Sequence, residues 1–430
     1  MKNVLMVAPY FTPRRRVGAL RPFKFAIHLR SYGYQPTVLT IRDHKSICTE
    51  REKELLKEIP VIEIDPPFDR TTTPNSDEKS QKKERHIISQ FMDWIDRNTP
   101  MDTWIYLFLK NYWKIIQLAK EVKPDLIWAT GDPWSGLWVG RRISKALELP
   151  LVADFRDPWT LTSVNLRKRS GFSEGIDQEI EKSIVNDASR LIFTSKLTEE
   201  KYRDRYYLPE SKTATIYNSF DRTMMKEHEE DVWDVKLKQN CLNIIFMGRF
   251  RRLSPATPII LALKELKEEN LPVLRCVRIH SFGQPDIEER EMIRDSGLEA
   301  NFIYHERVVP ENVNSVLKSA DILLLSTNQE RREIIPAKLW DYLSVEIPIL
   351  SIAPNPEVGE IIMRSKAGIQ IKPEQTHELA EILKSFAQAK KSGESLLLSP
   401  EKEIPDRNIY EAKQKTGELA ALFDDLLSNA

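Results

Sequence analysis

Residues 331–350 read RREIIPAKLWDYLSVEIPIL and form the most informative segment of the chain. One apolar run, Ile322–Ser326, precedes it and another, Ile347–Ile352, overlaps its end, and each predicts a buried strand. Between them, Pro336 suits the first position of a helix that continues over Ala337–Leu343. A strand, a loop, a helix and a further strand make one unit of a parallel sheet. The free amide groups at its loop-to-helix junction favour a phosphate group.

The same alternation of apolar runs and amphipathic stretches extends outward through the chain, which is typical of parallel α/β sheets. The strands predicted in the first half are Val4–Ala8, Thr37–Ile41, Val61–Ile64, Leu126–Thr130, Leu151–Asp154, Leu191–Thr194 and Thr213–Tyr217. The other strands predicted in the second half are Leu242–Met247, Val277–Phe282, Asn301–Tyr304 and Gly368–Ile371. The charged residues 222–240 between the two series indicate a connection, so the sequence predicts two sheets of the same kind.

Composition excludes several classes of protein. The 430 residues carry 64 Lys and Arg against 64 Asp and Glu, which argues against a nucleic-acid partner held by a global positive field. The three cysteines lie far apart in sequence, so we expect no disulfide framework, no zinc site and a reducing cytoplasm. No apolar run approaches the roughly 18 residues of a membrane span. Residues 103–119 predict an amphipathic helix instead.

Cationic and acidic side chains follow several of the predicted strands. Gly248 lets a ligand approach the backbone closely, and Arg249 can bind a diphosphate with two hydrogen bonds. A surface ion pair is the alternative for this arginine. In the quoted stretch Lys338 adds a positive charge to the first helical turn, and Glu333 and Asp341 can accept hydrogen bonds from sugar hydroxyls. The alternative is that the acid before the helix only complements the helix dipole and that Lys338 is solvated.

Two further strand ends lie in the first half. The loop over 9–21 holds Gly18 but lacks the Gly-x-Gly-x-x-Gly pattern, so NAD binding loses support. Its arginine run, 14–16, either faces an anionic lipid-linked acceptor or membrane headgroups, or is a solvated loop. The segment 154–157 contains Asp154, Arg156 and Asp157 at the end of a predicted strand. Buried charges without a partner are unfavourable, so these residues either have a function or form an internal Arg–Asp pair.

Taken in order, these motifs resemble the retaining glycosyltransferases of family 4, and the resemblance covers nearly the whole chain. The motifs are Phe11-x-Pro13 with Gly18, Asp-Phe-Arg-Asp-Pro-Trp at 154–159, Asn-Ser-Phe-Asp at 218–221, Gly-Arg-Phe at 248–250 and Ile-Pro-Ala-Lys-Leu-Trp-Asp-Tyr-Leu at 335–343. The resemblance implies the α/β GT-B fold, with two Rossmann-like parallel-sheet domains facing a central cleft. It implies an acceptor-side domain at 1–222 with a C-terminal helix within 406–430 packing back on it, a linker at 223–240 and a donor-binding domain at 241–405.

The resemblance also implies roles for individual residues. Glu333 would hold the donor sugar and Asp341 the ribose, while Arg249 and Lys338 would neutralise the diphosphate. The donor-binding set is Gly248, Arg249, Arg251, Arg252, Lys338 and Asp341, the catalytic pair is Asp157 and Glu333, and the acceptor-side loop is represented by Gly18, Arg21 and Arg156. The chain departs from the family pattern in having Asp341 for a second Glu and no Lys shortly after Gly-Arg.

The reaction implied is transfer of a sugar, with retention, from a nucleotide diphosphate sugar to a hydroxyl of a carbohydrate or lipid-linked acceptor, as in surface polysaccharide biosynthesis. No cofactor is expected. Metal independence is also expected, because no Asp-x-Asp site follows a strand and Glu63 and Asp65 have no other ligands nearby in sequence. Two alternatives remain: a nucleotide-sugar epimerase and a non-catalytic homologue acting as a scaffold.

Membrane contact is a separate hypothesis. The aromatic, lysine-bearing segment 103–120, with the basic runs 14–16 and 167–169, is suited to anionic lipid at the inner face of the membrane. A core-packed helix with soluble loops is the alternative.

Overall fold

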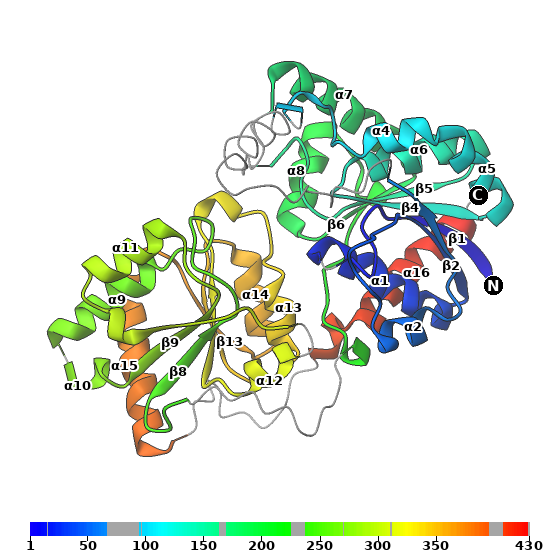
Figure 1. Cartoon of the computed structure of the whole chain (residues 1–430). Coiled ribbons are helices and arrows are strands. Elements are labelled where there is room, and N and C mark those ends of the chain that lie inside the picture. The colour runs from blue at the N-terminus through cyan, green and yellow to red at the C-terminus, as the bar shows by residue number, and fades with distance from the viewer. Residues whose placement is uncertain are drawn as a thin grey trace, which may run out of the picture. The chain divides into compact units, whose positions relative to one another are not determined.

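The computed structural model describes residues 1–14, 16–66, 94–95, 97–162, 169–224, 237–269, 271–309, 312–394 and 407–428. The chain divides into two compact units, Met1–Asn218 with Ala412–Ala430, and Ser219–Glu411. Each contains one parallel sheet with helices on both faces (Figure 1). The first unit thus ends at Asn218, before the predicted boundary at 222, and most of the predicted linker 223–240 lies outside the described residues.

The sheet of the first unit has the order β3-β2-β1-β4-β5-β6-β7, with every neighbouring pair parallel. Its strands are β1 (Lys2–Val7), β2 (Tyr34–Ile41), β3 (Val61–Ile64), β4 (Leu126–Gly131), β5 (Leu151–Phe155), β6 (Arg190–Phe193) and β7 (Thr213–Thr215). The chain builds outward from β1 to β3 and then continues on the other side of β1 at β4. In such sheets ligands bind beyond the carboxyl ends of the strands where the order reverses, here between β1 and β4.

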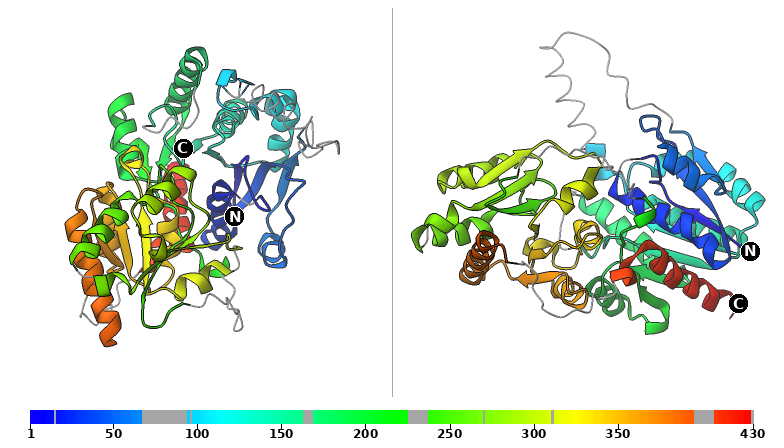
Figure 2. Two further views of the ribbon diagram at one scale, coloured as in Figure 1. Left: turned by 60° about the vertical axis from the view of Figure 1, so that its left-hand side comes forward. Right: turned by 90° about the horizontal axis from the view of Figure 1, so that it is seen from below.

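Helices cover both faces of this sheet because alternate strand residues point to opposite sides. The helices are α1 (Val17–Leu29), α2 (Glu50–Leu56), α4 (Ile105–Lys110), α5 (Tyr112–Val122), α6 (Ser135–Leu147), α7 (Gly171–Asp187), α8 (Lys196–Tyr206) and α16 (Ala412–Ser428). Ile127 lies in one core with Phe108 of α4, whereas the adjacent Trp128 contacts Phe25 of α1 edge to face. The C-terminal α16 packs beside α1, as both views in Figure 2 show.

The helix predicted over 103–119 is divided. Asn111 adopts φ −101° and ψ 11°, outside the helical range, so α4 ends at Lys110 and α5 begins at Tyr112. The Asn111 side chain donates a hydrogen bond to the Leu107 carbonyl at 2.9 Å, which stabilises this break. Among the described residues, none of the helices has both the length and the apolar character needed to cross a membrane.

The second unit has the strand order β10-β9-β8-β11-β12-β13, again parallel throughout. Its strands are β8 (Leu242–Phe246), β9 (Val277–Phe282), β10 (Phe302–His305), β11 (Ile322–Ser326), β12 (Ile349–Ile352) and β13 (Gly368–Ile371). The order reverses between β8 and β11, which places a second ligand position at the carboxyl ends of these two strands. Each strand predicted in either half overlaps a strand of the structure.

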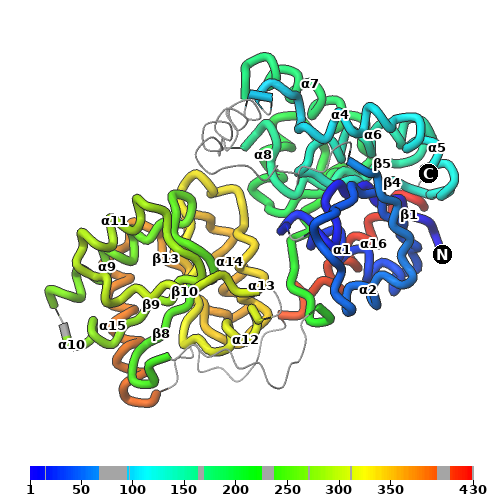
Figure 3. Tube along the Cα trace, in the orientation of Figure 1, coloured from blue at the N-terminus to red at the C-terminus, as the bar shows by residue number. Residues whose placement is uncertain are grey.

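The helices of the second unit are α9 (Thr257–Glu269), α10 (Leu271–Leu274), α11 (Ile287–Asp295), α12 (Val313–Lys318), α13 (Lys338–Leu343), α14 (Pro356–Arg364) and α15 (Thr376–Ser392). In the trace of Figure 3, α9 and α15 lie together on one side of the sheet and α12 to α14 on the other. The prediction for the start of α13 was wrong: the helix begins at Lys338. Leu339 and Trp340 donate to Pro336 and Ala337 three residues back, so the chain there forms turns ahead of the helix.

Candidate functional site

The carboxyl edge of the second sheet brings a half-buried lysine, Lys338, against a glycine. Gly248, which follows β8, has φ +135°, a conformation that favours glycine. A Cβ atom at this position would lie 2.9 Å from the Lys338 ammonium nitrogen. That nitrogen lies 3.8 Å from the centroid of the Phe246 ring, at the end of β8. The Lys338 ammonium group therefore occupies the space beside Gly248, at the carboxyl ends of β8 and β11 where the strand order reverses.

Burial and two nearby arginines both disfavour the charged form of Lys338. Burial, followed by the charges of Arg251 and Arg331, lowers the pKa of Lys338 to about 7. Three basic groups thus converge on one loop edge, and an anion bound there would favour the charged form of the lysine. Arg331 belongs to the quoted stretch, yet it was not among the predicted site residues. Nothing in the sequence places it near Gly248 until the strand order is known.

Two other predicted donor-site arginines make ion pairs within the unit. The Arg249 guanidinium lies 3.0 Å from the Asp286 carboxylate, and both side chains are well exposed. Arg252 pairs with Glu330. The alternative of a surface ion pair therefore holds for Arg249 in this structure. Lys338, with Arg251 near it, is the predicted cation that packs directly on Gly248.

Tyr342 fixes α13 to the strand ends. Its hydroxyl accepts a hydrogen bond from the Met247 amide at 3.0 Å and donates one to the Leu324 carbonyl at 3.0 Å. Burial raises the pKa of Tyr342, so the hydroxyl keeps its proton. Since Met247 follows β8 and Leu324 lies in β11, one side chain ties the helix bearing Lys338 to both strands. Tyr342 belongs to the 335–343 motif, but nothing in the local sequence indicates that its hydroxyl joins two strands.

The two predicted acids flank Lys338 along the chain. Glu333 lies in the turn that follows β11 and its residue surface is 7% exposed, whereas Asp341 lies in α13 and is half-buried. Within the residues that the structure describes, no three metal-ligating side chains of the His, Cys, Asp or Glu type gather at one place. Metal independence stays a prediction.

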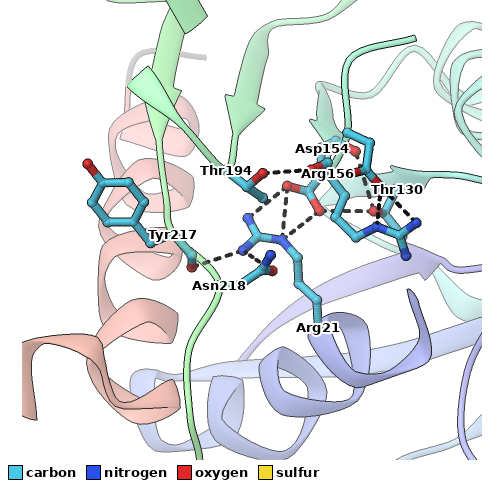
Figure 4. A network of polar contacts seen from close by, with 8 residues as sticks. Arg21, Thr130, Asp154, Arg156, Thr194, Tyr217 and Asn218 are labelled. Atoms are coloured by element: carbon cyan, nitrogen blue, oxygen red, sulfur yellow. Dashed lines mark hydrogen bonds and ion pairs between the residues drawn. The ribbon is translucent and has the colours of Figure 1, made fainter. Parts of the chain in front are cut away.

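The first unit contains a buried ion pair below the corresponding edge (Figure 4). Arg21 contacts Asp154 through Nε at 2.9 Å and Nη2 at 2.8 Å, and the side chains are 4% and 0% exposed. Thr130 donates to the same carboxylate at 2.9 Å, and Arg21 also donates to the Tyr217 carbonyl at 3.0 Å. The assignment of Arg21 to an acceptor-side loop is therefore corrected: it lies inside α1 and joins that helix to β5 and to the segment after β7.

Arg156 meets Gly18 in the same region. A Cβ atom on Gly18 would lie 2.0 Å from Arg156 Nη1, so the guanidinium occupies the space that glycine leaves. Arg156 also pairs with Asp157 at 3.1 Å. Burial lowers the pKa of this arginine, but the carboxylates of Asp157, Asp132 and Asp154 raise it further than burial lowers it. Gly18, Arg156 and Asp157 thus lie together in this unit, and the Asp157 side chain is 37% exposed.

The predicted site residues therefore form two groups, one in each unit. Asp157 belongs to the first unit and Glu333 to the second, so the two proposed catalytic acids come from different sheets. Of the basic runs expected to contact lipid, Arg15, Arg167 and Lys168 lie outside the described residues.

Two family models match the chain. The Glycosyltransferase Family 4 model matches residues 23–223, and the Glycosyl transferases group 1 model matches residues 227–396. The two matches together cover most of the sequence. No curated protein sequence matches the chain.

Solved structures resemble the whole chain. Sucrose-phosphate synthase from Thermosynechococcus elongatus has a TM-score of 0.65 at 11% identity, covering 100% of both chains. HepE of Anabaena in complex with UDP has a TM-score of 0.59 at 16% identity, covering 99% of this chain and 100% of that one, and HepE was also solved with UDP-glucose. A putative UDP-N-acetylglucosamine 2-epimerase from Listeria monocytogenes has a TM-score of 0.54 at 11% identity, covering 100% and 97%. The predicted GT-B architecture of two Rossmann-like α/β domains is confirmed.

Breaking the buried Arg21–Asp154 ion pair by removing one partner should strongly destabilise the first unit. Asp154→Leu leaves the arginine charge buried without its partner, so we expect the free energy of unfolding to fall by about 3–5 kcal/mol. The double variant Arg21→Met with Asp154→Leu removes both charges and should recover a large part of this loss. Urea denaturation followed by circular dichroism measures both. A double variant no more stable than Asp154→Leu would contradict the assignment.

Proposed function

Because the chain is a glycosyltransferase with the GT-B fold, we propose that it transfers a sugar, with retention, from a nucleotide diphosphate sugar to an acceptor hydroxyl. The observation that carries this proposal is the packing of Lys338 on Gly248, with Arg251 and Arg331 contributing positive charge. A diphosphate has the charge that suits such a position. HepE, which has the same fold, binds UDP and UDP-glucose, in keeping with a donor of this class.

The chemical task assigned to this position is stabilisation of the leaving group. Negative charge builds on the departing diphosphate as the bond to the sugar breaks, and cations fixed beforehand lower the energy of that state. Lys338 meets this need in a particular way. Because its pKa is about 7 in the free protein, donor binding also draws a proton onto the neutral amino group and converts it to ammonium.

The roles proposed for the other residues follow from their positions in the family motifs. Glu333 and Asp341 would accept hydrogen bonds from the donor sugar and the ribose, and Arg249 would leave Asp286 for the diphosphate. Asp157 would act on the acceptor side, where its carboxylate is partly exposed. We identify no second carboxylate as a nucleophile, so the leaving phosphate would assist attack from the same face. A metal-independent reaction in the cytoplasm, serving surface polysaccharide, completes the proposal.

A non-catalytic homologue is the second candidate. The Arg249–Asp286 ion pair favours it, since this arginine has a partner within the fold. An epimerase is the third, because the fold is shared with a putative enzyme of that kind. A transferase needs an acceptor and releases the nucleotide, an epimerase releases a new nucleotide sugar without one, and a scaffold does neither.

Donor binding is tested by a thermal-shift screen with UDP-, GDP- and ADP-glucose. We expect one of these to raise Tm, and Lys338→Met to weaken its binding roughly ten- to hundredfold, as for the loss of a hydrogen bond to a charged group. Lys372→Met is the matched control, because this lysine is exposed elsewhere in the same unit. If no nucleotide sugar raises Tm, or if both lysine variants bind the donor alike, the proposed donor site is wrong.

Transfer itself is tested on Glu333 and Arg249. Glu333→Gln and Arg249→Ala should each lower kcat/KM for nucleotide release roughly ten- to hundredfold, because each removes a hydrogen bond involving a charged group. Activity should persist in a chelator. A scaffold would show no acceptor-dependent release in any form of the chain, and activity lost with chelator and restored by Mg²⁺ or Mn²⁺ would overturn metal independence.

The pH dependence of donor binding follows from Lys338. Above a pKa of about 7 the free protein holds this lysine neutral, whereas the anionic donor favours the charged form. The Kd of the donor should therefore rise with pH above 7, by up to about tenfold per unit. Arginine keeps its charge at this pH, so Lys338→Arg should flatten the dependence. Calorimetric titration between pH 6 and 9 measures it, and equal slopes for the two proteins would contradict the role of Lys338.

A further inference from the structure

One outward face of α4 and α5 carries large apolar side chains that the fold leaves uncovered. Tyr106, Leu109 and Trp113 are 57%, 53% and 79% exposed. They follow one another at steps of three and four residues, which places them on the same side of the helix pair despite the break between α4 and α5. The opposite side, with Phe108 and Ile115, already packs in the core. The apolar residues of the exposed face therefore do not contribute to the core of this unit.

Positive charge surrounds these side chains. Lys110, Lys114 and Lys120 are exposed and share the face, which carries a single exposed acid, Glu121, among residues 105–122. This acid accepts a hydrogen bond from Gln117 at 3.3 Å. Aromatic side chains flanked by lysines are typical of protein surfaces that bind anionic lipid.

An aromatic and basic cluster adjoins the start of α4. Trp104, which directly precedes the helix, lies under the Arg14 guanidinium at 5.6 Å and donates a hydrogen bond to the Tyr10 hydroxyl at 3.4 Å. Arg14 and Arg16 also lie over the Tyr10 ring, at 4.9 Å and 5.2 Å. The loop that follows β1 therefore contacts Trp104, the residue that directly precedes α4.

We propose that Tyr106, Leu109, Lys110, Trp113 and Lys114, named here the α4–α5 surface, dock the first unit on an anionic lipid bilayer. Trp113, Tyr106 and Leu109 enter the interfacial region, where amphipathic rings are stable. The lysines extend their stems along the surface and place their ammonium groups among the lipid phosphates. This inference does not depend on the proposed transfer reaction.

Vesicle sedimentation tests the proposal. The full chain should sediment at low salt with vesicles of phosphatidylglycerol and phosphatidylcholine, and only weakly with phosphatidylcholine alone. Each basic residue near an anionic surface contributes roughly fivefold to binding, so Lys110→Glu with Lys114→Glu should reduce partitioning at least about 25-fold. Trp113→Ser should reduce it roughly tenfold through lost apolar contact. Circular dichroism establishes that each variant is folded.

Matched controls lie in the same unit, away from α4 and α5. Tyr207→Asn removes a ring that is 94% exposed, at φ 53° where asparagine is tolerated, and Lys182→Glu reverses one exposed charge of α7. Both should bind vesicles as the unmodified chain does. The proposal is overturned if the chain does not sediment with anionic vesicles, or if the α4–α5 variants bind as well as the controls. It is also overturned if light scattering shows that Trp113→Ser converts a dimer to a monomer while vesicle binding is unchanged.

Discussion

A lysine held against a glycine is the constraint on which the candidate site depends. Lys338 lies across the end of β8, where a Cβ atom on Gly248 would come within 2.9 Å of its nitrogen. Burial and, after it, two nearby arginines lower the pKa of Lys338 and make its charged form unfavourable in the free protein. A group that is costly to charge when alone becomes favourable once an anion is present. An anionic ligand would therefore shift Lys338 to its charged form. The hydrogen bonds of Tyr342 to Met247 and Leu324 fix the helix that carries Lys338 to the strand ends.

In both units a cationic side chain packs against a glycine. In the first, the guanidinium of Arg156 fills the space left by Gly18, and in the second the ammonium group of Lys338 fills the space beside Gly248. In each case the glycine follows the first strand of its sheet, and the cation arrives from a loop or helix beyond a strand on the other side of the reversal. The difference lies in the counter-charges. Carboxylates surround Arg156 and raise its pKa, whereas arginines help to lower that of Lys338. This contrast supports giving the diphosphate to the second unit.

The strands could be predicted because buried parallel strands are short, apolar and separated by amphipathic helices, a pattern written locally in the sequence. Contacts between distant loops could not. Arg21 lies close in sequence to the β1 loop, yet its phase on α1 turns it inward to Asp154. Arg249 was expected on the ligand and pairs with Asp286 after β9. Lys338 was predicted to be a site residue, but its contact with Gly248 depends on strand order, which the local pattern does not contain.

A crystal structure with the tightest-binding nucleotide sugar would show whether Lys338 binds the diphosphate. We expect diphosphate oxygens within hydrogen-bonding distance of Lys338 Nζ, lying over Gly248, with the Arg249 guanidinium turned from Asp286 toward the ligand. A diphosphate bound away from the end of β8, with Lys338 still packed on the Phe246 ring and making no contact to it, would contradict the account.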